Sequence, residues 1–330
     1  MKNKIEIAAC TDRWFVMPTG VMMVSVCENN PETDVVFHII VDDNVSAEDQ
    51  QDIKDIAASY VGKSVVFYKA NEAMQKESFP KGIIRPDITK TAYYRLYLAE
   101  LLPREIDKVL YMDGDVIVRH SLLPLWNTDF GENAVAAVTD CSSGCIEFYN
   151  RLHYPFELGY FNSGVLLVNL RYWREHQVLN DFVSYMENHA DSINFWDQDV
   201  LNVVFRDKKV LIPLKYNLQH PFLFEKTDAY DYWKLEQEVL EAREDPCIVH
   251  FTARWKPWRI YHRGWVHPFS STWDKYQNKS KWKGIKYDYR TKSQRIKRYA
   301  GNILRRFGLL PPLIQNSYFP TIAPTIAPID

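Results

Sequence analysis

Two aspartates interrupt an apolar run in the stretch VLYMDGDVIV, where Asp113 and Asp115 stand on either side of Gly114. Burying an unpaired carboxylate is costly, so the pair needs a cation, a reaction or access to solvent. Residues i and i+2 of an extended chain face the same way, which would let both carboxylates converge on one hard divalent cation. Asp113 could instead be the nucleophile of a phosphatase. The DGD sequence could also form a solvated turn, since Asp and Gly are common in turns.

A second polar group follows a predicted strand much later in the chain. In IVHFTARWKPW, His250 comes at the strand end and Lys256 precedes Pro257 and Trp258. A histidine at such a place is more often a packing or hydrogen-bonding residue. Together with the two aspartates, however, it would complete a set of two oxygen ligands and one nitrogen ligand, which suits Mn²⁺ or Mg²⁺ better than a structural zinc site. Lys256 would lie near the metal as a point charge suited to phosphate.

These residues need a scaffold, and the first part of the chain predicts one from alternating strands and helices. KIEIAAC, DVVFHIIVDD and KSVVFYKA predict buried strands. Between the first two, Pro18 is suited to the start of a helix. After the second, Ser46, with Asp49 three residues on, is typical of a helix N-cap. The alternation predicts an α/β fold with a mostly parallel, doubly wound sheet. Ligands of such sheets bind beyond the carboxyl ends of the strands, where the Asp113 and Asp115 pair is expected.

Later segments continue the pattern. AVAAVTD and YFNSGVLLVNL predict central strands, and CIVHFT predicts a late strand. RYWREHQVLNDFVSYMENHA and DQDVLNVVFRD predict helices. The globular body is predicted to end near Trp273, after which a Lys-rich composition takes over.

Cysteine usage and hydropathy favour a cytoplasmic protein. The five cysteines are scattered, which argues against a disulfide framework. Cys141 and Cys145 could form half of a zinc site, but no second Cys/His pair at ligand spacing accompanies them. The start of the chain does not resemble a signal peptide, and no apolar run reaches about 18 residues. We therefore expect the chain to stay in the cytoplasm.

The region after the body is strongly basic. Residues 274–310 contain twelve Lys and Arg against two Asp. Within them, residues 293–308 predict a helix that joins an apolar stripe to a cationic face. Such a helix could lie on an anionic bilayer or dock on the acidic body. Nucleic acid is not expected as a partner, because no recognised module accompanies the charge. Residues 311–330 are punctuated by proline and are expected to be poorly ordered.

Six motifs across roughly residues 5–260 carry a family resemblance, namely ACTDRWF, TAYYRLYLAELLP, YMDGDVIV, YFNSGVLLVNL, WDQDVLN and HFTARWKPW. In this order they resemble glycosyltransferase family 8, the group that contains glycogenin and the bacterial lipopolysaccharide galactosyl- and glucosyltransferases. The resemblance implies a GT-A type, Rossmann-like domain over residues 1–273, with a mostly parallel sheet and flanking helices. A basic amphipathic helical tail would follow at 274–310.

The resemblance implies that Asp113, Asp115 and His250 hold Mn²⁺, with Mg²⁺ as an alternative, on the diphosphate of a UDP-sugar. Lys256 would neutralise the phosphates further and assist the departure of UDP. The same family pattern makes the expected enzyme metal-dependent.

The nucleotide base would be held by residues of the first strand end. By resemblance, Asp12 would receive the uracil N–H and Phe15 would lie against its ring; from the residues alone, Asp12 could equally be a helix N-cap. The chain departs from the family at two positions, since the family often has Asn at Trp14 and Gly at Ala253. The first change would alter ribose contacts, and the second would crowd the phosphates.

Four further residues fall where the family grips the donor sugar: Arg95, Asn162, Asp197 and Gln198. Each also has an ordinary structural interpretation, with Arg95 in a surface ion pair, Asn162 in a strand-end turn and Asp197 as the cap of its helix; Gln198 is not needed for capping. Family enzymes retain the anomeric configuration, and Gln198 would lie near the reacting face with Asp197 beside it. An amide is a weak nucleophile, which favours same-face attack by the acceptor over a covalent intermediate.

The expected function is transfer of glucose or galactose from UDP-glucose or UDP-galactose to a glycan, with cell-envelope lipopolysaccharide or another glycolipid as the acceptor. The enzyme would be peripheral at the inner face of the cytoplasmic membrane. Two alternatives stand beside it. A haloacid-dehalogenase-like phosphohydrolase would use Asp113 as its nucleophile, although its motif normally lies on the first strand. A non-catalytic sugar-nucleotide-binding protein would bind without turnover.

Overall fold

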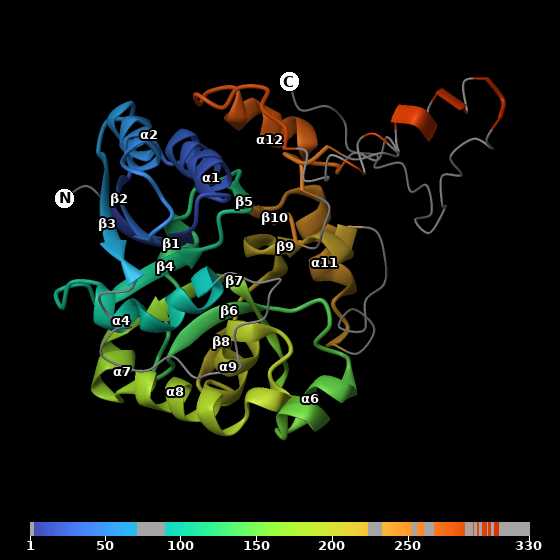
Figure 1. Cartoon of the computed structure of the whole chain (residues 1–330). Coiled ribbons are helices and arrows are strands. Elements are labelled where there is room, and N and C mark those ends of the chain that lie inside the picture. The colour runs from blue at the N-terminus through green and yellow to red at the C-terminus, as the bar shows by residue number, and fades with distance from the viewer. Residues whose placement is uncertain are drawn as a thin grey trace.

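The computed structural model describes residues 3–70, 90–223, 233–252, 256–260 and 267–287, and further on residues 293, 296, 299–301, 303–304 and 307–309. Within these residues the chain forms an α/β body in which helices cover both faces of a large sheet (Figure 1). The predicted α/β class is therefore confirmed.

The large sheet has seven strands in the order β3-β2-β1-β4-β7-β6-β8. Only β7 runs against its neighbours β4 and β6, and the other pairings are parallel, so the expectation of a mostly parallel sheet is confirmed. The strands are β1 (Lys4–Thr11), β2 (Asp34–Val41), β3 (Lys63–Lys69), β4 (Lys108–Met112), β6 (Val135–Thr139), β7 (Phe161–Asn169) and β8 (Lys209–Leu211).

A second, smaller sheet was not anticipated. It has three strands in the order β5-β10-β9, with β10 antiparallel to β5 and parallel to β9. Its strands are β5 (Val116–Val118), β9 (Leu218–Gln219) and β10 (Ile248–His250). The apolar run around the two aspartates therefore contributes β4 to the large sheet and β5 to the small sheet. The late strand of CIVHFT exists, but it belongs to this small sheet.

Two hydrophobic clusters cover the two faces of the large sheet, because successive strand residues point to opposite sides. Ile5 and Ile7 of β1 pack with helices α1 (Val16–Asn29) and α2 (Ala47–Ala58), whereas Ala8 and Cys10 pack on the other face. That second face is covered by η1 (Lys90–Tyr97), α4 (Leu98–Leu101), α7 (Leu170–Glu175), α8 (Val178–Asn188) and α9 (Trp196–Val204). The remaining elements are α5 (Leu123–Trp126), α6 (Ile146–Leu152), η2 (Phe156–Leu158), η3 (Ala190–Ser192), η4 (Leu214–Tyr216), η5 (His220–Leu223), α11 (Glu236–Glu244) and α12 (Ser270–Gln277).

Local signals in the sequence explain several helix boundaries. Ser46 caps α2 in a capping box, because its hydroxyl accepts the Asp49 N–H while the Asp49 carboxylate accepts the Ser46 N–H. Pro18 lies in the first turn of α1, where a missing N–H costs nothing. The segment that predicted one helix after β7 forms two, α7 and α8, because Gln177 takes a left-handed conformation (φ 50°) between them.

The chain stays packed on the body beyond Trp273. Helix α12 ends at Gln277, and Trp282 beyond it is buried against α1. Gly20 of α1 makes room for the Trp282 ring, because a Cβ at this position would lie 2.3 Å from Trp282 Cζ3. The described tail residues further on are helical at 293, 296, 299–301 and 303–304. Their apolar side chains are exposed, including Ile296 (61%) and Phe307 (73%). Residues 311–330, expected to be poorly ordered, lie outside the described residues.

In the described parts of the chain, no helix combines the length and apolar character needed to cross a membrane.

Candidate active site

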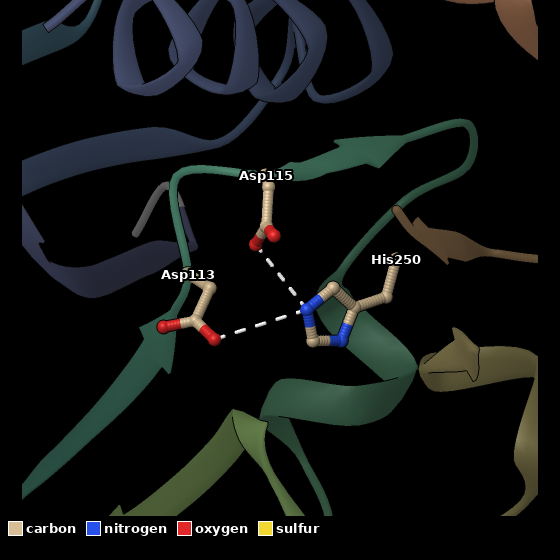
Figure 2. Close-up of side chains that lie close together, drawn as sticks. All are labelled: Asp113, Asp115 and His250. Atoms are coloured by element: carbon tan, nitrogen blue, oxygen red, sulfur yellow. Dashed lines mark ion pairs between the residues drawn. The ribbon is translucent and has the colours of Figure 1, made fainter. Parts of the chain in front are cut away.

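Three predicted metal ligands converge at the junction of the two sheets. Asp113 follows β4, Asp115 precedes β5, and His250 ends β10. One oxygen of each carboxylate and one ring nitrogen lie within 4.8 Å of one another. Figure 2 shows that the same nitrogen of His250 faces both carboxylates; Nε2 is 3.2 Å from Asp115 Oδ1 and 3.8 Å from Asp113 Oδ2. Two carboxylates and an imidazole suit a divalent cation such as Mn²⁺ or Mg²⁺.

The backbone around this cluster leaves no room for extra side-chain atoms. A Cβ on Gly164 of β7 would lie 2.2 Å from His250 Cε1 and 2.8 Å from Asp113 Oδ2. A Cβ on Gly114, between the two aspartates, would lie 2.6 Å from Thr19 Oγ1. Glycine at these two positions therefore allows β7 and helix α1 to approach the aspartates closely.

Lys256 lies beside the metal cluster as predicted. Its ammonium group contacts Asp115 Oδ2 and donates to the carbonyl oxygen of Phe251. Burial alone would raise the pKa of Asp115, but its interactions with Lys256 and His250 hold that pKa well below its ordinary value. Asp115 is therefore a carboxylate at neutral pH, which is the form that binds a metal.

Arg95 ties the metal cluster to the predicted donor-sugar residues. It comes from η1 and is buried, with Nη2 2.9 Å from Asp113 Oδ1 and Nε 3.1 Å from Asp197 Oδ2. It also donates to the carbonyl oxygen of Ser163 (2.7 Å) and lies over the Tyr111 ring. Burial alone would lower the pKa of Arg95, but the two carboxylates raise it above its ordinary value. The interpretation of Arg95 as a member of a surface ion pair is therefore wrong, because its ion pairs are buried.

Asp197 is not the cap of helix α9. Its Oδ2 accepts a hydrogen bond from Ser163 Oγ (2.9 Å) as well as the contact with Arg95. The N-cap residue is Phe195, and Asp199, inside the helix, binds the backbone just before it, since its Oδ2 accepts the N–H groups of Asn194 and Phe195 at 2.7 Å each. Complete burial raises the pKa of Asp197 to about 6, and the Asp113 charge adds to that rise while Arg95 opposes it.

Gln198 and Asn162 meet at the edge of the same region. Gln198 Oε1 accepts the Ser163 N–H (3.0 Å) and the Asn162 amide (3.2 Å), while its Nε2 donates to Asp140 Oδ2 (3.2 Å). Asn162 also donates to Asp140 Oδ2 (3.0 Å), so it is part of a buried network and not of a strand-end turn. The structure thus brings the four predicted donor-sugar residues together.

The predicted base-binding residues line a cavity of about 180 Å³ that also includes Arg95 and both metal-cluster aspartates. Asp12 and Phe15 come from the turn between β1 and α1. Asp12 Oδ1 accepts the N–H groups of Trp14 (2.8 Å) and Phe15 (3.1 Å) in the turn before α1, whose N-cap residue is Phe15, so Asp12 is not the helix N-cap considered from the sequence. Trp14 is half exposed, and Ala253 lies outside the described residues.

Sequence reasoning missed four residues that complete this site: Tyr111, Asp140, Ser163 and Asn217. Asp140 directly follows β6, so the strand-end argument used for the metal aspartates could have identified it. The Tyr111 hydroxyl donates a hydrogen bond to Asp113 Oδ1 (2.8 Å). From the sequence, its place in an apolar strand predicted only a core residue. Asn217 precedes a strand of two residues, and nothing in the sequence around it predicts a contact with His250.

The comparisons with known proteins point in one direction. The model described as Glycosyl transferase family 8 matches residues 6–261. General stress protein A of Bacillus subtilis (strain 168) is 25% identical over 284 residues, covering 85% of this chain and 96% of that protein. The Lipopolysaccharide 1,3-galactosyltransferase of Salmonella typhimurium is 26% identical over 287 residues, covering 85% and 80%. The crystal structure of the galactosyltransferase LgtC in complex with donor and acceptor sugar analogs matches with a TM-score of 0.68 and 25% identity, covering 89% of this chain and 100% of that one.

Proposed function

The chain belongs to glycosyl transferase family 8 and has a GT-A-like α/β fold, and from this premise we propose that it is a metal-dependent, retaining transferase that moves glucose or galactose from a UDP-sugar to a glycan. The observation that carries the proposal is the convergence of Asp113, Asp115 and His250 beside Lys256. The family assignment replaces the phosphohydrolase considered from the sequence. Asp113, which that alternative needed as a nucleophile, is held through Oδ1 by Tyr111 and Arg95.

The proposed donor chemistry follows from charge. When the bond between the anomeric carbon and UDP breaks, negative charge grows on the diphosphate. A Mn²⁺ or Mg²⁺ ion held by Asp113, Asp115 and His250 supplies Lewis-acid stabilisation of that charge. Lys256 adds a second positive charge beside Asp115, while Asp12 and Phe15, which line the same cavity as the two aspartates, hold the base.

The proposed stereochemistry rests on Gln198. Its carbonyl oxygen already accepts hydrogen bonds from Ser163 N and from the Asn162 amide, which withdraw electron density from an oxygen that is a weak nucleophile. Arg95 engages Asp197 through Oδ2, which disfavours nucleophilic attack on the sugar by that carboxylate. This arrangement supports same-face attack by the acceptor through an ion-pair-like state, in preference to a covalent enzyme intermediate. Arg95, Asn162 and Asp197 would then orient the hexose.

The test is a donor-hydrolysis and transfer screen with purified protein, Mn²⁺ and a panel of nucleotide sugars. UDP-glucose or UDP-galactose should be consumed in preference to GDP- and CMP-sugars, and the product should be α-linked. EDTA should abolish the reaction and added Mn²⁺ should restore it. Full activity in EDTA would contradict the metal assignment, a β-linked product would contradict retention, and UDP binding without any turnover would favour the sugar-nucleotide-binding alternative.

The proposed acceptor is a glycolipid or other cell-envelope glycan met at a membrane surface. Relatives named as lipopolysaccharide glycosyltransferases support this class. The exposed apolar side chains of the tail, among them Ile296, Tyr299 and Phe307, support peripheral attachment at the inner face of the cytoplasmic membrane. The intact chain should sediment with anionic liposomes at low salt and be released by high salt, because basic residues near such a surface contribute about 1 kcal/mol each.

Truncation after Tyr287 is the matched control, since it keeps α12 and Trp282 on the body. It should remove liposome binding while UDP-sugar hydrolysis stays largely intact. If the truncated protein binds liposomes as well as the full chain, the tail has no part in attachment and the acceptor proposal rests on the relatives alone.

A further inference from the structure

The metal-facing histidine has a second contact that decides which of its nitrogens carries a proton. Nε2 of His250 faces the two carboxylates, and Nδ1 lies 2.9 Å from Oδ1 of Asn217. Both residues are buried, Asn217 completely. A neutral imidazole carries its proton on one nitrogen only, and the nitrogen that binds a metal must be the other one.

The direction of these hydrogen bonds follows from the backbone N–H of Gly164, which can only donate. The N–H of Gly164 donates to one amide atom of Asn162 at 3.0 Å, so that atom is the carbonyl oxygen Oδ1. The same oxygen is 2.8 Å from the Asn217 side chain, which must therefore present its NH2 group there. The Asn217 carbonyl oxygen then faces His250, and an oxygen can only accept. Hence Nδ1 of His250 carries the proton.

A second anchor gives the same direction independently. The other amide atom of Asn162 lies 3.0 Å from Asp140 Oδ2 and 3.2 Å from Gln198 Oε1. A carboxylate accepts and does not donate, so this atom of Asn162 is the nitrogen. The two ends of the Asn162 amide thus agree.

We infer that Asn217 is a positioning residue: its carboxamide fixes His250 as the Nδ1–H tautomer, leaves the Nε2 lone pair on the metal side, and links the metal cluster to the donor-sugar residue Asn162. The role toward a metal rests on the proposed function, whereas the tautomer does not. Partners behind a metal-binding histidine typically change metal affinity about 10- to 100-fold when they are removed. Because Asn217 also donates to Asn162, its loss should disturb both halves of the site.

The first measurement needs no metal. In metal-free protein labelled with ¹⁵N-histidine, two-bond proton–nitrogen correlations at pH 8 distinguish the two neutral tautomers. Comparison with His250→Gln assigns the His250 signals among the nine histidines. We expect a proton on Nδ1 in the wild type, whether or not Nε2 is also protonated beside the two carboxylates, and loss of that preference in Asn217→Ala. An Nε2–H form in the wild type would overturn the inference.

The second measurement is Mn²⁺ affinity by calorimetry. Asn217→Ala should weaken binding about 10- to 100-fold. The matched control is Asn30→Ala, which removes another buried asparagine that accepts from Leu122 N and donates to the Val26 carbonyl oxygen. It should lower the melting temperature while leaving the tautomer and Mn²⁺ affinity unchanged. Equal Mn²⁺ affinities of the two variants would overturn the positioning role, because loss of a buried amide would then have no specific effect.

A third variant separates the two hydrogen bonds of Asn217. Asn217→Asp keeps an acceptor for His250 Nδ1 but cannot donate to Asn162 Oδ1. It should keep the Nδ1–H tautomer and bind Mn²⁺ within a few-fold of the wild type, while transfer slows because Asn162 is released. Loss of Mn²⁺ binding as large as in Asn217→Ala would contradict the inference. A wild type with the Nδ1–H tautomer but no Mn²⁺ binding would overturn the proposed metal dependence while supporting the tautomer assignment.

Discussion

Two polar networks lie on the same large sheet, one around Glu6 near the amino end of β1 and one beyond the carboxyl end of β4, and they differ in whether their ligand atoms are already used. At the amino end, Glu6 accepts from Lys4 through Oε1 (2.6 Å) and contacts His38 through Oε2 (2.9 Å), and the other nitrogen of His38 contacts the Tyr68 hydroxyl (2.9 Å). Every one of these groups has a partner within the network.

At the carboxyl end, Tyr111 and Arg95 hold Asp113 through Oδ1, whereas its Oδ2 faces the Nε2 of His250 across 3.8 Å. A larger cavity does not mark the candidate site. The cavity beside Glu6 has a volume of about 580 Å³, and the one beside Asp113 and Asp115 has about 180 Å³. The difference shows that convergent atoms with remaining bonding capacity identify a candidate site better than burial, charge or volume.

The strongest test of this comparison removes one carboxylate from each end. Asp115→Asn should reduce transfer by at least about 100-fold, because it removes both a proposed metal ligand and the partner of Lys256. Glu6→Gln at the other end should leave transfer unchanged. Circular dichroism should show that both variants are folded. Comparable losses of activity would mean that the amino-end network also takes part in the reaction.

A second comparison uses two neighbours on α9. Gln198→Ala should lower kcat about 100-fold while UDP binding changes little, because the proposed role of Gln198 is at the reacting face. Asp199→Asn should instead lower the melting temperature, since both Asp199 oxygens are engaged by Arg151, Tyr160 and backbone N–H groups. Steady-state kinetics and UDP calorimetry separate the two. Equal losses of kcat and UDP affinity in Gln198→Ala would reassign Gln198 to donor binding.

A matched pair of tyrosines gives a smaller effect. Tyr111→Phe removes the hydroxyl that helps to hold Asp113 Oδ1, and should weaken Mn²⁺ binding about 10-fold. Tyr68→Phe removes the hydroxyl beside His38 and should not change Mn²⁺ affinity. Calorimetric titration of the two variants measures the difference. If they bind Mn²⁺ equally well, Arg95 alone suffices to orient Asp113.

The smallest expected effect is on acid stability at the amino end. Burial alone would raise the pKa of Glu6, but His38 and Lys4 hold it below its ordinary value. The unfolded chain then binds more protons than the folded one, so this contribution is complete above the unfolded pKa and is lost as the pH falls through the folded one. Glu6→Gln should lower the free energy of unfolding by about 1 kcal/mol at pH 7 and flatten its decline below about pH 4.5. An unchanged acid decline in urea titrations would show that other carboxylates dominate it.

Local features of the chain were predictable, and long-range pairings were not. The Ser46 cap, the strands of the large sheet other than β8, and the convergence of Asp113, Asp115 and His250 follow from short-range patterns or from the family resemblance. The sequence did not predict that the chain changes sheets at Gly114, because strand pairing with β10 depends on residues far away.

The choice between neighbouring aspartates shows the same limit. Asp197 and Asp199 have similar sequence signals, and a cap was one interpretation of the first, yet it is Asp199 whose carboxylate binds the backbone N–H groups of Asn194 and Phe195 before the helix. Asn217 could not be found for the same reason, since its importance comes entirely from what it contacts in space.

The division of the metal ligands between two sheets also bears on how the chain folds. His250 is placed opposite the aspartates by β10, which pairs with β5 and β9, and such long-range pairings are slow to form. A metal that needs all three ligands would bind the assembled protein and not its earlier intermediates. At a hundred times its dissociation constant it would add about 2.7 kcal/mol to the free energy of unfolding. In a refolding experiment, the appearance of Mn²⁺ binding would therefore mark the moment at which the small sheet joins the large one.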